Sequence, residues 1–243
     1  MNREVHVRFS EGLGLKCPGL LDTAIPELLA TLALEGTIVT IDAMGTQTQI
    51  AHAIRKRGAD YVLCVKDNHP KLVESILPML AGVAGPIEAT THFEERDKPG
   101  RHGRTEIRRC WAYDAVSHLH KHEQWDGLKS FAVVERSRTV DGKTSVERQF
   151  YISSLPADAK LLAGAVRSHW QIENRLHWCL DVQLNDDQSR ARSGYAAHNL
   201  AVVRHIVLNL LRLDSSRKAS IKSKRLLACS DDAFRAELLG LMT

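Results

Sequence analysis

Two runs of sequence decide the fold, Thr37-Ile-Val-Thr-Ile-Asp42 and Tyr61-Val-Leu-Cys-Val65. Both are rich in β-branched and apolar residues, which is typical of strands buried on both faces. A helical segment at 47–57, ended by Gly58, lies between them, and another helix begins near Pro70. Strand, helix, strand, helix at this spacing predicts parallel strands joined by right-handed crossovers.

The segment before the first run predicts two short strands and a helix. Residues 5–9 and 13–16 alternate apolar and polar around a turn at Glu11-Gly12. The helix is expected to be capped by Thr23, with Pro26 in its first turn and Gly36 just past its end. Its apolar face would consist of Ile25, Leu28, Leu29 and Leu32.

The remainder of the chain predicts a β-rich insertion followed by helices. Strand-like runs occur at 105–113, 130–138 and 145–152, and Asp141-Gly142 is a hairpin turn pair between the last two. A long helix is expected from Pro156 and Asp158 to about 180, another at 196–213, and a basic tail at 217–225 before a short helix. The predicted organisation is 1–86 and 155–243 as parts of one catalytic domain, with 87–154 as the insertion.

Composition narrows the class of protein. A net charge of +4 permits a polyanionic partner without requiring one. The five cysteines form no Cys-x-x-Cys pair, which argues against a disulfide framework or a zinc knuckle. The start has no apolar signal region, and no apolar run approaches the roughly 20 residues of a membrane span. We therefore expect a soluble cytoplasmic protein.

Asp42 is the first candidate for chemistry. A carboxylate at the carboxyl end of a buried parallel strand lies where α/β sheets present ligands, and Ala43-Met-Gly45 lets the chain turn away. The alternative is that Asp42 only caps the next helix.

Glu173 is the second candidate, in His169-Trp-Gln-Ile-Glu173-Asn-Arg-Leu-His177-Trp178. The spacing of four puts His169, Glu173 and His177 on one helix face. The alternative is a solvated charged stripe with the tryptophans anchoring the core. A zinc hydrolase site of these three residues ranks well below, because successive ligands from one helix rarely close a tetrahedral shell.

Several motifs together resemble the insertion-sequence DDE transposases, in the branch that includes the H-repeat-associated proteins. One group is Val39-Thr-Ile-Asp42-Ala-Met-Gly45 with Gln47, Gly58-Ala-Asp60-Tyr-Val-Leu63 and Lys66-x-Asn68. The other is Tyr151-Ile-Ser-Ser-Leu155, the Glu173 segment through Val182, Asp187 and Arg190-x-Arg192. These motifs cover most of residues 23–212.

The resemblance implies an RNase H-like α/β fold in which three carboxylates hold two Mg²⁺ or Mn²⁺ ions for in-line displacement at phosphorus. By motif, Asp42 is then the second aspartate and Glu173 the glutamate, both catalytic and metal-binding. The wider superfamily has tyrosine, arginine and lysine at the positions occupied here by Val166, His169 and Leu180, which changes the expected DNA contacts.

The family's first aspartate, in an Asp-Gly-Lys motif on the first strand, is not found upstream of Asp42. Asp141-Gly-Lys143 comes after it and is interpreted as the insertion's hairpin turn. The sequence therefore predicts an N-terminally truncated transposase without its first central strand. Unpaired sheet edges beside that gap would favour misfolding or association.

DNA-binding residues are expected around the site and along a basic stretch. The candidates from the motifs are Lys66, Asn68, His169, Trp170, Arg175, Arg190 and Arg192. Between Arg204 and Arg225 there are seven basic residues against one acid, which could bind phosphates or could form a solvated helix face with a loose tail.

The predicted function is that of a DDE transposase fragment, inactive alone, whose family chemistry is DNA strand cleavage and transfer. The expected partners are insertion-sequence ends and target DNA in the bacterial nucleoid, with a homodimer or a full-length transposase. The alternative is a non-catalytic DNA-binding or oligomerising remnant that interferes with the full-length enzyme.

Overall fold

The computed structural model of the chain describes residues 3–7, 18–80, 88–97, 104–172, 176 and 178–241. The chain divides into two compact units, residues 1–169 and 170–243. Among the described residues, no helix combines the length and the apolar character that crossing a bilayer requires.

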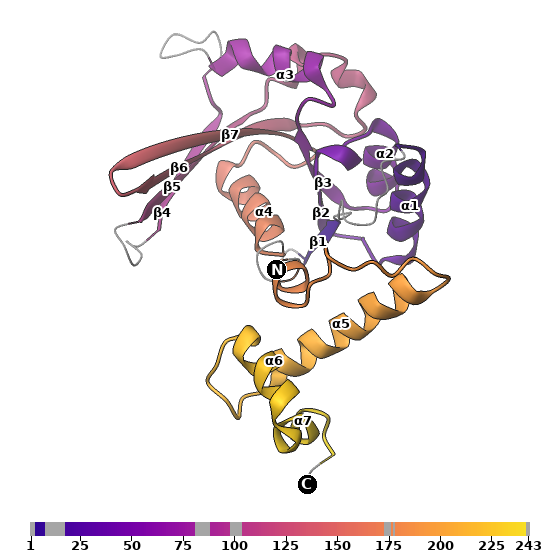
Figure 1. Ribbon diagram of the computed structural model, residues 1–243. Helices are drawn as coiled ribbons and strands as arrows, with labels where there is room; N and C mark the ends of the chain where they lie inside the picture. Colours follow the sequence, from indigo (N-terminus) through magenta and orange to yellow (C-terminus); the bar gives the residue numbers. More distant parts are fainter. Residues whose placement is uncertain are drawn as a thin grey trace. The chain divides into compact units, whose positions relative to one another are not determined.

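The first unit is built on a seven-stranded mixed sheet in the order β1-β2-β3-β7-β6-β5-β4 (Figure 1). β1, β2 and β3 are parallel, and the other neighbouring pairs are antiparallel. The strands comprise β1 (Arg3–Val7), β2 (Thr37–Ile41), β3 (Asp60–Val65), β4 (Thr91–Arg96), β5 (Thr105–Tyr113), β6 (Ser130–Val140) and β7 (Lys143–Ser153).

The parallel half of the sheet confirms the predicted strand–helix–strand order. Val39 on β2 lies opposite Tyr61 on β3, and on its other side opposite Val5 on β1. The expectation of an unpaired edge beside the strand that leads to Asp42 is therefore wrong, because β1 pairs directly with β2. The second predicted short strand, at 13–16, lies outside the described residues.

The antiparallel half of the sheet comes from the predicted insertion. β7 pairs with β3, with Ile152 opposite Leu63, so the insertion strands continue the same sheet. β4 was not predicted from the sequence. Asp141 and Gly142 connect β6 to β7 with φ values of 50° and 75°, as a tight hairpin turn of mirror type requires. Asp141 is thus a turn residue, as predicted.

Four helices of the first unit correspond to the predicted ones. They are α1 (Pro18–Thr31), α2 (Thr48–Lys56), α3 (Pro70–Ile76) and α4 (Ala159–Ile172). α1 begins at Pro18 rather than after Thr23, so the predicted cap is wrong and Pro26 lies inside the helix. Proline fits the first helical turn, where its missing N–H costs nothing, and Pro18 occupies that place. Asp158 caps α4 by accepting from the Lys160 and Leu161 amides.

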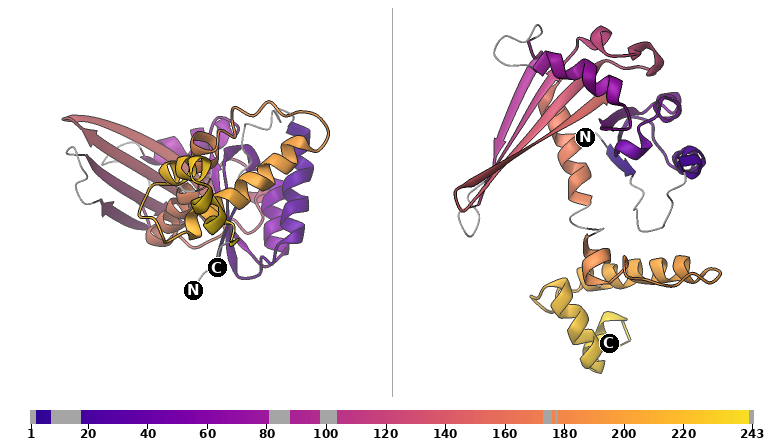
Figure 2. Two further views of the ribbon diagram at one scale, coloured as in Figure 1. Left: turned by 60° about the horizontal axis from the view of Figure 1, so that its bottom comes forward. Right: turned by 45° about the horizontal axis from the view of Figure 1, so that its top comes forward.

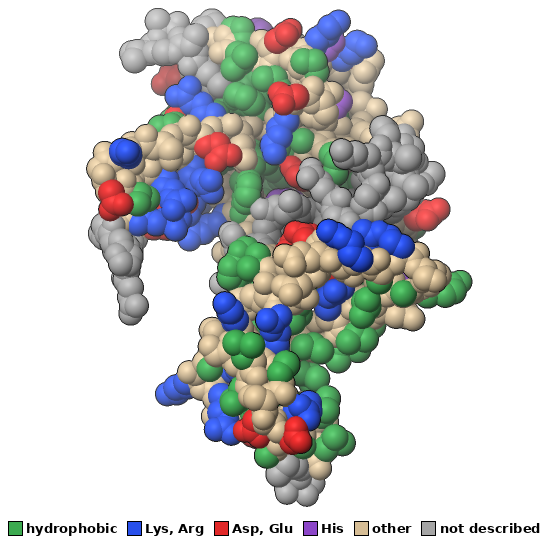
Figure 3. All heavy atoms as spheres, in the orientation of Figure 1, with side chains coloured by type: hydrophobic (Ala, Val, Ile, Leu, Met, Phe, Trp, Pro, Cys, Tyr) green, Lys and Arg blue, Asp and Glu red, His purple; other side chains and the backbone are tan. Residues whose placement is uncertain are grey.

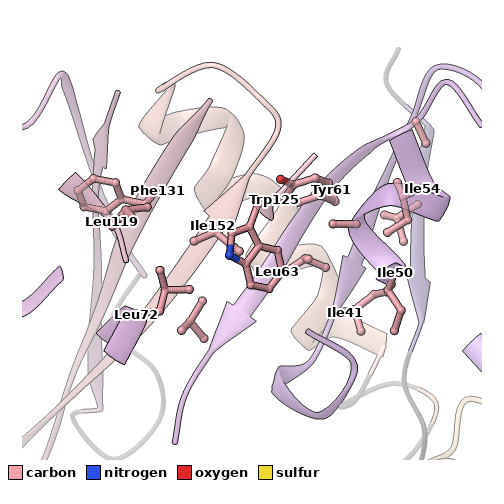
Figure 4. Close-up of a cluster of buried hydrophobic side chains, with 14 of the residues drawn as sticks. Ile41, Ile50, Ile54, Tyr61, Leu63, Leu72, Leu119, Trp125, Phe131 and Ile152 are labelled. Carbon is pink, nitrogen blue, oxygen red and sulfur yellow. The ribbon is translucent and has the colours of Figure 1, made fainter. Parts of the chain in front are cut away.

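The main core lies between the sheet and the helices α1, α2 and α3 (Figure 4). Ile25 and Leu29 of α1 are fully buried there, whereas Leu28, predicted on the same face, is exposed. Alternation along the strands turns one set of side chains toward this core and the other set toward the opposite face. α4 lies on that opposite face (Figure 2), where it contacts β2 and β4. Short 3₁₀ turns complete the unit: η2 (Ala43–Gly45), η3 (Leu77–Leu80), η5 (Val116–His118) and η6 (His122–Gln124).

The second unit has a small core formed by Cys179, Leu180 and Leu208. Its elements are the π-helical turn η8 (Cys179–Gln183), α5 (Ala196–Leu213), α6 (Ile221–Ser230) and α7 (Asp232–Leu238). α5 matches its prediction, and the predicted basic tail at 217–225 is helical from Ile221 onward, where α6 begins. Buried Lys224 lies on α6, with its ammonium 2.7 Å from the Asp214 carboxylate. The predicted continuation of α4 to about 180 includes positions 173–175 and 177, which lie outside the described residues.

Candidate active site

Asp42 directly follows the last residue of β2. Its backbone is still extended, with φ −71° and ψ 166°. Side chains alternate along extended backbone, so Asp42 shares a face with Thr40, the face on which α4 packs. The carboxylate is 41% exposed. The buried parallel strand therefore delivers an accessible carboxylate to the carboxyl edge of the sheet.

The contacts of Asp42 combine a structural role with an open oxygen. Oδ1 accepts a 2.8 Å hydrogen bond from the Ala43 amide and so caps η2, and the Lys66 ammonium lies 3.7 Å from the same oxygen. Among the described residues, nothing bonds to Oδ2. Capping and ligand binding, the two readings that the sequence left open, are thus compatible, because each uses a different oxygen.

The segment after β3 braces the turn that follows Asp42. The Asn68 amide Nδ2 donates to the Ala43 carbonyl at 2.6 Å, and His69 Nε2 lies 2.6 Å from the Thr46 carbonyl. The Thr46 hydroxyl in turn donates to the Cys64 carbonyl at 2.6 Å. These three bonds join the loops at the carboxyl ends of β2 and β3 into one structure.

Thr46 and His69 were not singled out from the sequence. The His69 and Trp125 rings make a T-shaped contact with their centroids 5.4 Å apart, and Trp125 is buried in the main core. The only local signal for His69 was its place after Lys66-x-Asn68. Because Thr46 and Trp125 are far from it in sequence, spacing alone could not reveal this role.

Cys64 lies on β3 between the two loops and is buried. Burial raises the pKa of its thiol to about 12, since the thiolate would lose its hydration. The thiol is therefore neutral at physiological pH and is neither a thiolate ligand nor a nucleophile there. Among the described residues, the groups that this edge offers are therefore oxygen and nitrogen atoms.

His169 lies in the last turn of α4 and contacts the Asp42 strand. Its Nδ1 is 3.0 Å from the Thr40 hydroxyl. Glu173, the predicted second carboxylate, lies outside the described residues, as do Arg175 and His177. Trp170 is partly buried in the same helix and belongs to the second unit.

Two more of the predicted DNA-binding residues belong to the second unit. Arg190 and Arg192 are exposed in the segment between η8 and α5, in the second unit. Of the predicted site residues, the structure brings together Asp42, Lys66 and Asn68, with His169 joined to them through the Asp42 strand. Of these, Lys66 has a charged ammonium group on a side chain that is 48% exposed, so its charge is accessible from solvent.

A set of arginines on β4–β7 was missed by the sequence reading. Buried Glu135 accepts from Arg109 and Arg148 at 3.1 and 2.8 Å, and buried Glu106 accepts from Arg104 at 2.7 Å. Basic side chains accordingly gather over these strands (Figure 3). Because each carboxylate lies inward, the arginines line the surface, though they are largely neutralised by their partners.

The residues present are compatible with part of a magnesium or manganese site. Asp42 offers the hard oxygen ligand that these ions prefer. Within the described ranges, no three side chains of the types His, Cys, Asp and Glu converge as a ligand set. Asp42 is thus the one described member of the expected set. The zinc alternative stays untested, since two of its three ligands, Glu173 and His177, lie outside the described residues.

The first unit is therefore a mixed α/β domain whose candidate active site is an aspartate at the end of a buried parallel strand. Hydrogen bonds from the loop after the neighbouring strand hold the turn that follows this aspartate. Residues 22–210 match the family model described as "Transposase DDE domain". The chain therefore belongs to the DDE transposase family, as the motifs predicted.

Individual relatives agree with this assignment. The chain is 37% identical over 226 residues to YbfL and to the H-repeat-associated protein YhhI, both of Escherichia coli strain K12, in each case covering 90% of this chain and 58% of the relative. It is also 37% identical over 243 residues to YncI of Escherichia coli O157:H7, covering 91% of this chain and 60% of the relative. The chain thus spans about three-fifths of the length of these relatives.

Proposed function

We propose that Asp42 and Glu173 are metal-binding carboxylates of a DDE centre that acts in DNA transposition. The reaction would be phosphodiester hydrolysis and strand transfer at insertion-sequence ends and target DNA. The observation that carries the proposal is the position of Asp42. An accessible carboxylate ends a buried parallel strand, with one oxygen fixed by the Ala43 amide and the other bonded to nothing among the described residues.

The chemistry of the surrounding residues supports this role. Bound Mg²⁺ or Mn²⁺ would activate the attacking water or 3′-hydroxyl and stabilise the leaving oxygen. Asp42 would hold such an ion through Oδ2, while the loop bonds of Asn68 and His69 keep its carboxylate oriented. The Lys66 ammonium, 3.7 Å from Asp42, would attract a phosphate to the same edge.

The proposed DNA-contacting residues are Lys66 in the first unit and Trp170, Arg175, Arg190 and Arg192 in the second. Lys66 and the two exposed arginines present cationic groups to solvent. Asn68 and His169 fit internal roles better, because their polar atoms bond to Ala43 and Thr40.

A third carboxylate of the family triad is assigned to no residue of this chain. β1 lies beside β2, in a position suited to such a group, but its sequence, Arg3-Glu-Val-His-Val7, contains no aspartate. We therefore propose that the 243-residue chain does not cleave DNA unaided and depends on a partner that supplies this carboxylate, such as a full-length transposase.

The first test is nicking of supercoiled DNA in Mg²⁺ or Mn²⁺ by the chain and by Asp42→Asn and Glu173→Gln. Asp67→Asn, an exposed carboxylate near the same edge, is the matched control. Cleavage that both site variants abolish and the control retains would establish the centre and refute the dependence on a partner. Cleavage that survives both would refute the assignment of these residues.

The alternative function is a non-catalytic DNA-binding or oligomerising remnant. Its signature is salt-dependent DNA binding without cleavage, together with inhibition of a full-length transposase when the two are mixed. Lys66→Ala should then reduce the slope of log K for DNA binding against log salt concentration by about one, because one phosphate contact is lost. Lys71→Ala, also exposed and near the same edge, should change it less if Lys66 has a specific place on the DNA.

A further inference from the structure

We propose that the open edge of β7 is an interface at which a second copy of this chain pairs strand to strand. β7 pairs with β6 as far as the hairpin turn, but with β3 only at residues 150–153. The first part of β7, residues 143–149, runs past the end of β3, and within the described chain its other side is unpaired (Figure 1). The inference is independent of the metal site proposed above.

Backbone groups of β7 point to this open side at every second residue. In an antiparallel sheet, the N–H and C=O of successive residues face alternately toward the two neighbouring strands. The Ser154 amide donates to the Tyr61 carbonyl, on the side of β3. Counted back from Ser154, the even-numbered residues of β7 therefore face that side, and those beyond the end of β3 are Thr144, Val146 and Arg148.

The open edge is accessible and carries an apolar side chain at its middle. Residues 143–148 are all exposed, and Val146 is 56% exposed. An exposed strand with free N–H and C=O groups is a template for pairing with another strand. The edge therefore has both the backbone groups and the apolar contact that strand addition uses.

The side chains of this edge are complementary to themselves in one antiparallel register. A two-fold axis through Ser145 places Lys143 of each copy opposite Glu147 of the other, and opposite charges at such positions attract. The same axis places Thr144 of each copy opposite Val146 of the other. Both residues face the open side, so each of these two pairs would exchange two backbone hydrogen bonds.

Neighbouring registers are less favourable. Hydrogen bonding requires open residues to meet open residues, so the axis can move only in steps of one residue. An axis through Glu147 sets two carboxylates opposite each other. An axis through Val146 brings Lys143 of one copy within about 3.4 Å along the strand of Val65 of the other, because Val65 ends β3 opposite Phe150. Two chains cannot approach so closely.

The charged residues of the proposed interface are available for these contacts. Lys143 is exposed and forms no ion pair within the described ranges. Glu147 is held by Arg136 of β6 at 2.8 Å, yet its side chain remains 51% exposed. A second copy would thus approach Glu147 from the side away from Arg136. Because the shared edge is short, the dimer is expected to be weak and to depend on concentration.

The first test is sedimentation velocity of the full chain over a concentration series, with urea unfolding to verify that each variant is folded. The unmodified chain should shift from monomer to dimer as its concentration rises. Val146→Pro should stay monomeric, because proline lacks the N–H on the open side, and the β6 ladder does not use that N–H. Val146→Thr should dimerise like the unmodified chain. A chain that is monomeric throughout, or a dimer unaffected by Val146→Pro, overturns the proposal.

Charge reversal tests the register. Lys143→Glu and Glu147→Lys should each weaken the dimer roughly ten- to hundredfold, because like charges then meet at two places. An equimolar mixture of the two variants should restore it, since each copy then meets the opposite charge. Lys129→Glu, at an exposed position before β6, is the control and should change nothing. A mixture that associates no better than the separate variants would exclude this pairing.

A cross-link locates the axis. The two copies of Ser145 would face each other with Cα atoms about 4.5 Å apart, within the range of a disulfide. In a Cys229→Ser background, which removes an exposed native thiol, Ser145→Cys should form a covalent dimer on mild oxidation. Adding Val146→Pro should abolish it. An equal yield with Val146→Pro would mean that the cross-link arises from random collisions, and the proposed interface would be wrong.

Discussion

The side-chain amide of Asn68 donates a 2.6 Å hydrogen bond to the backbone carbonyl of Ala43, the residue after Asp42. Its Oδ1 accepts from the Lys66 amide at 3.2 Å. One side chain therefore ties together the two loops at the carboxyl edge of the parallel strands. This is an internal role, unlike the DNA contact that the sequence suggested.

Removing this side chain should cost stability more than DNA affinity. Asn68→Ala is expected to lower the free energy of unfolding by about 0.5–1.5 kcal/mol, the usual net value of such a bond. Asp67→Ala, next to it and exposed, should have little effect. Urea unfolding measures both. An Asn68→Ala chain that keeps full stability but binds DNA more weakly would restore the DNA-contact interpretation.

Gly45 closes the turn after Asp42 where a side chain has no room. A Cβ there would lie 2.5 Å from Ile41 Cγ2 and 2.8 Å from Ile25 Cδ1, both in the main core. Gly45→Ala should therefore destabilise the chain by about 1–3 kcal/mol through overpacking.

Gly164 in α4 is the control for this substitution, because a Cβ there meets nothing within 4 Å. Gly164→Ala should stabilise by about 0.5–1 kcal/mol, as alanine is the better helix former. Thermal or urea unfolding of the pair should give opposite signs. Equal effects would mean that the space around Gly45 is not as tight as described.

Tyr61 carries a buried hydroxyl with no hydrogen-bond partner within the described part of the chain. Burial raises the pKa of this phenol, since its anion would be desolvated. Tyr61→Phe should leave the free energy of unfolding within about 0.5 kcal/mol or increase it, because it removes an unpaired polar group.

Tyr151 offers the contrasting case. It is also buried, but its hydroxyl donates to Gln149 Oε1 at 2.6 Å. Tyr151→Phe should cost about 0.5–1.5 kcal/mol. Urea unfolding measures the free energy of unfolding of both variants. A larger loss of stability in Tyr61→Phe than in Tyr151→Phe would indicate a partner for the Tyr61 hydroxyl, such as an internal water.

The Asp214–Lys224 pair predicts acid sensitivity of the second unit. The hydrogen bond from Lys224, with a further one from Ser216, lowers the pKa of the Asp214 carboxyl to about 2 from an ordinary value of 3.8. A lowered folded-state pKa contributes stability that is present above pH 3.8 and is lost as the pH falls through about 2.

Hydrogen exchange of α5 and α6 as a function of pH measures this contribution. Protection should fall between about pH 4 and pH 2 in the unmodified chain, and Asp214→Asn should show no such step there. Asp232→Asn is the control, because its carboxylate is 90% exposed. A step of the same size in Asp214→Asn would assign the acid sensitivity to another carboxyl group.

The sequence by itself determined the features that depend on local pattern. Apolar runs, helix stops and a turn pair give β2, β3, the helices that follow them and the β6–β7 hairpin, because periodicity and turn chemistry act over a few residues. Short motifs likewise determined the family and pointed to Asp42. Glu173 stays a prediction on the same grounds.

Only the tertiary structure decided what joins residues distant in sequence. It paired β1 with β2, made the insertion strands part of the main sheet, and folded the basic stretch around Lys224 and Asp214. It also bonded Asn68 and His169 to partners 25 and 129 residues away. A side chain's spacing in the sequence shows which face it occupies, but its hydrogen-bond partner is set by which elements pack together.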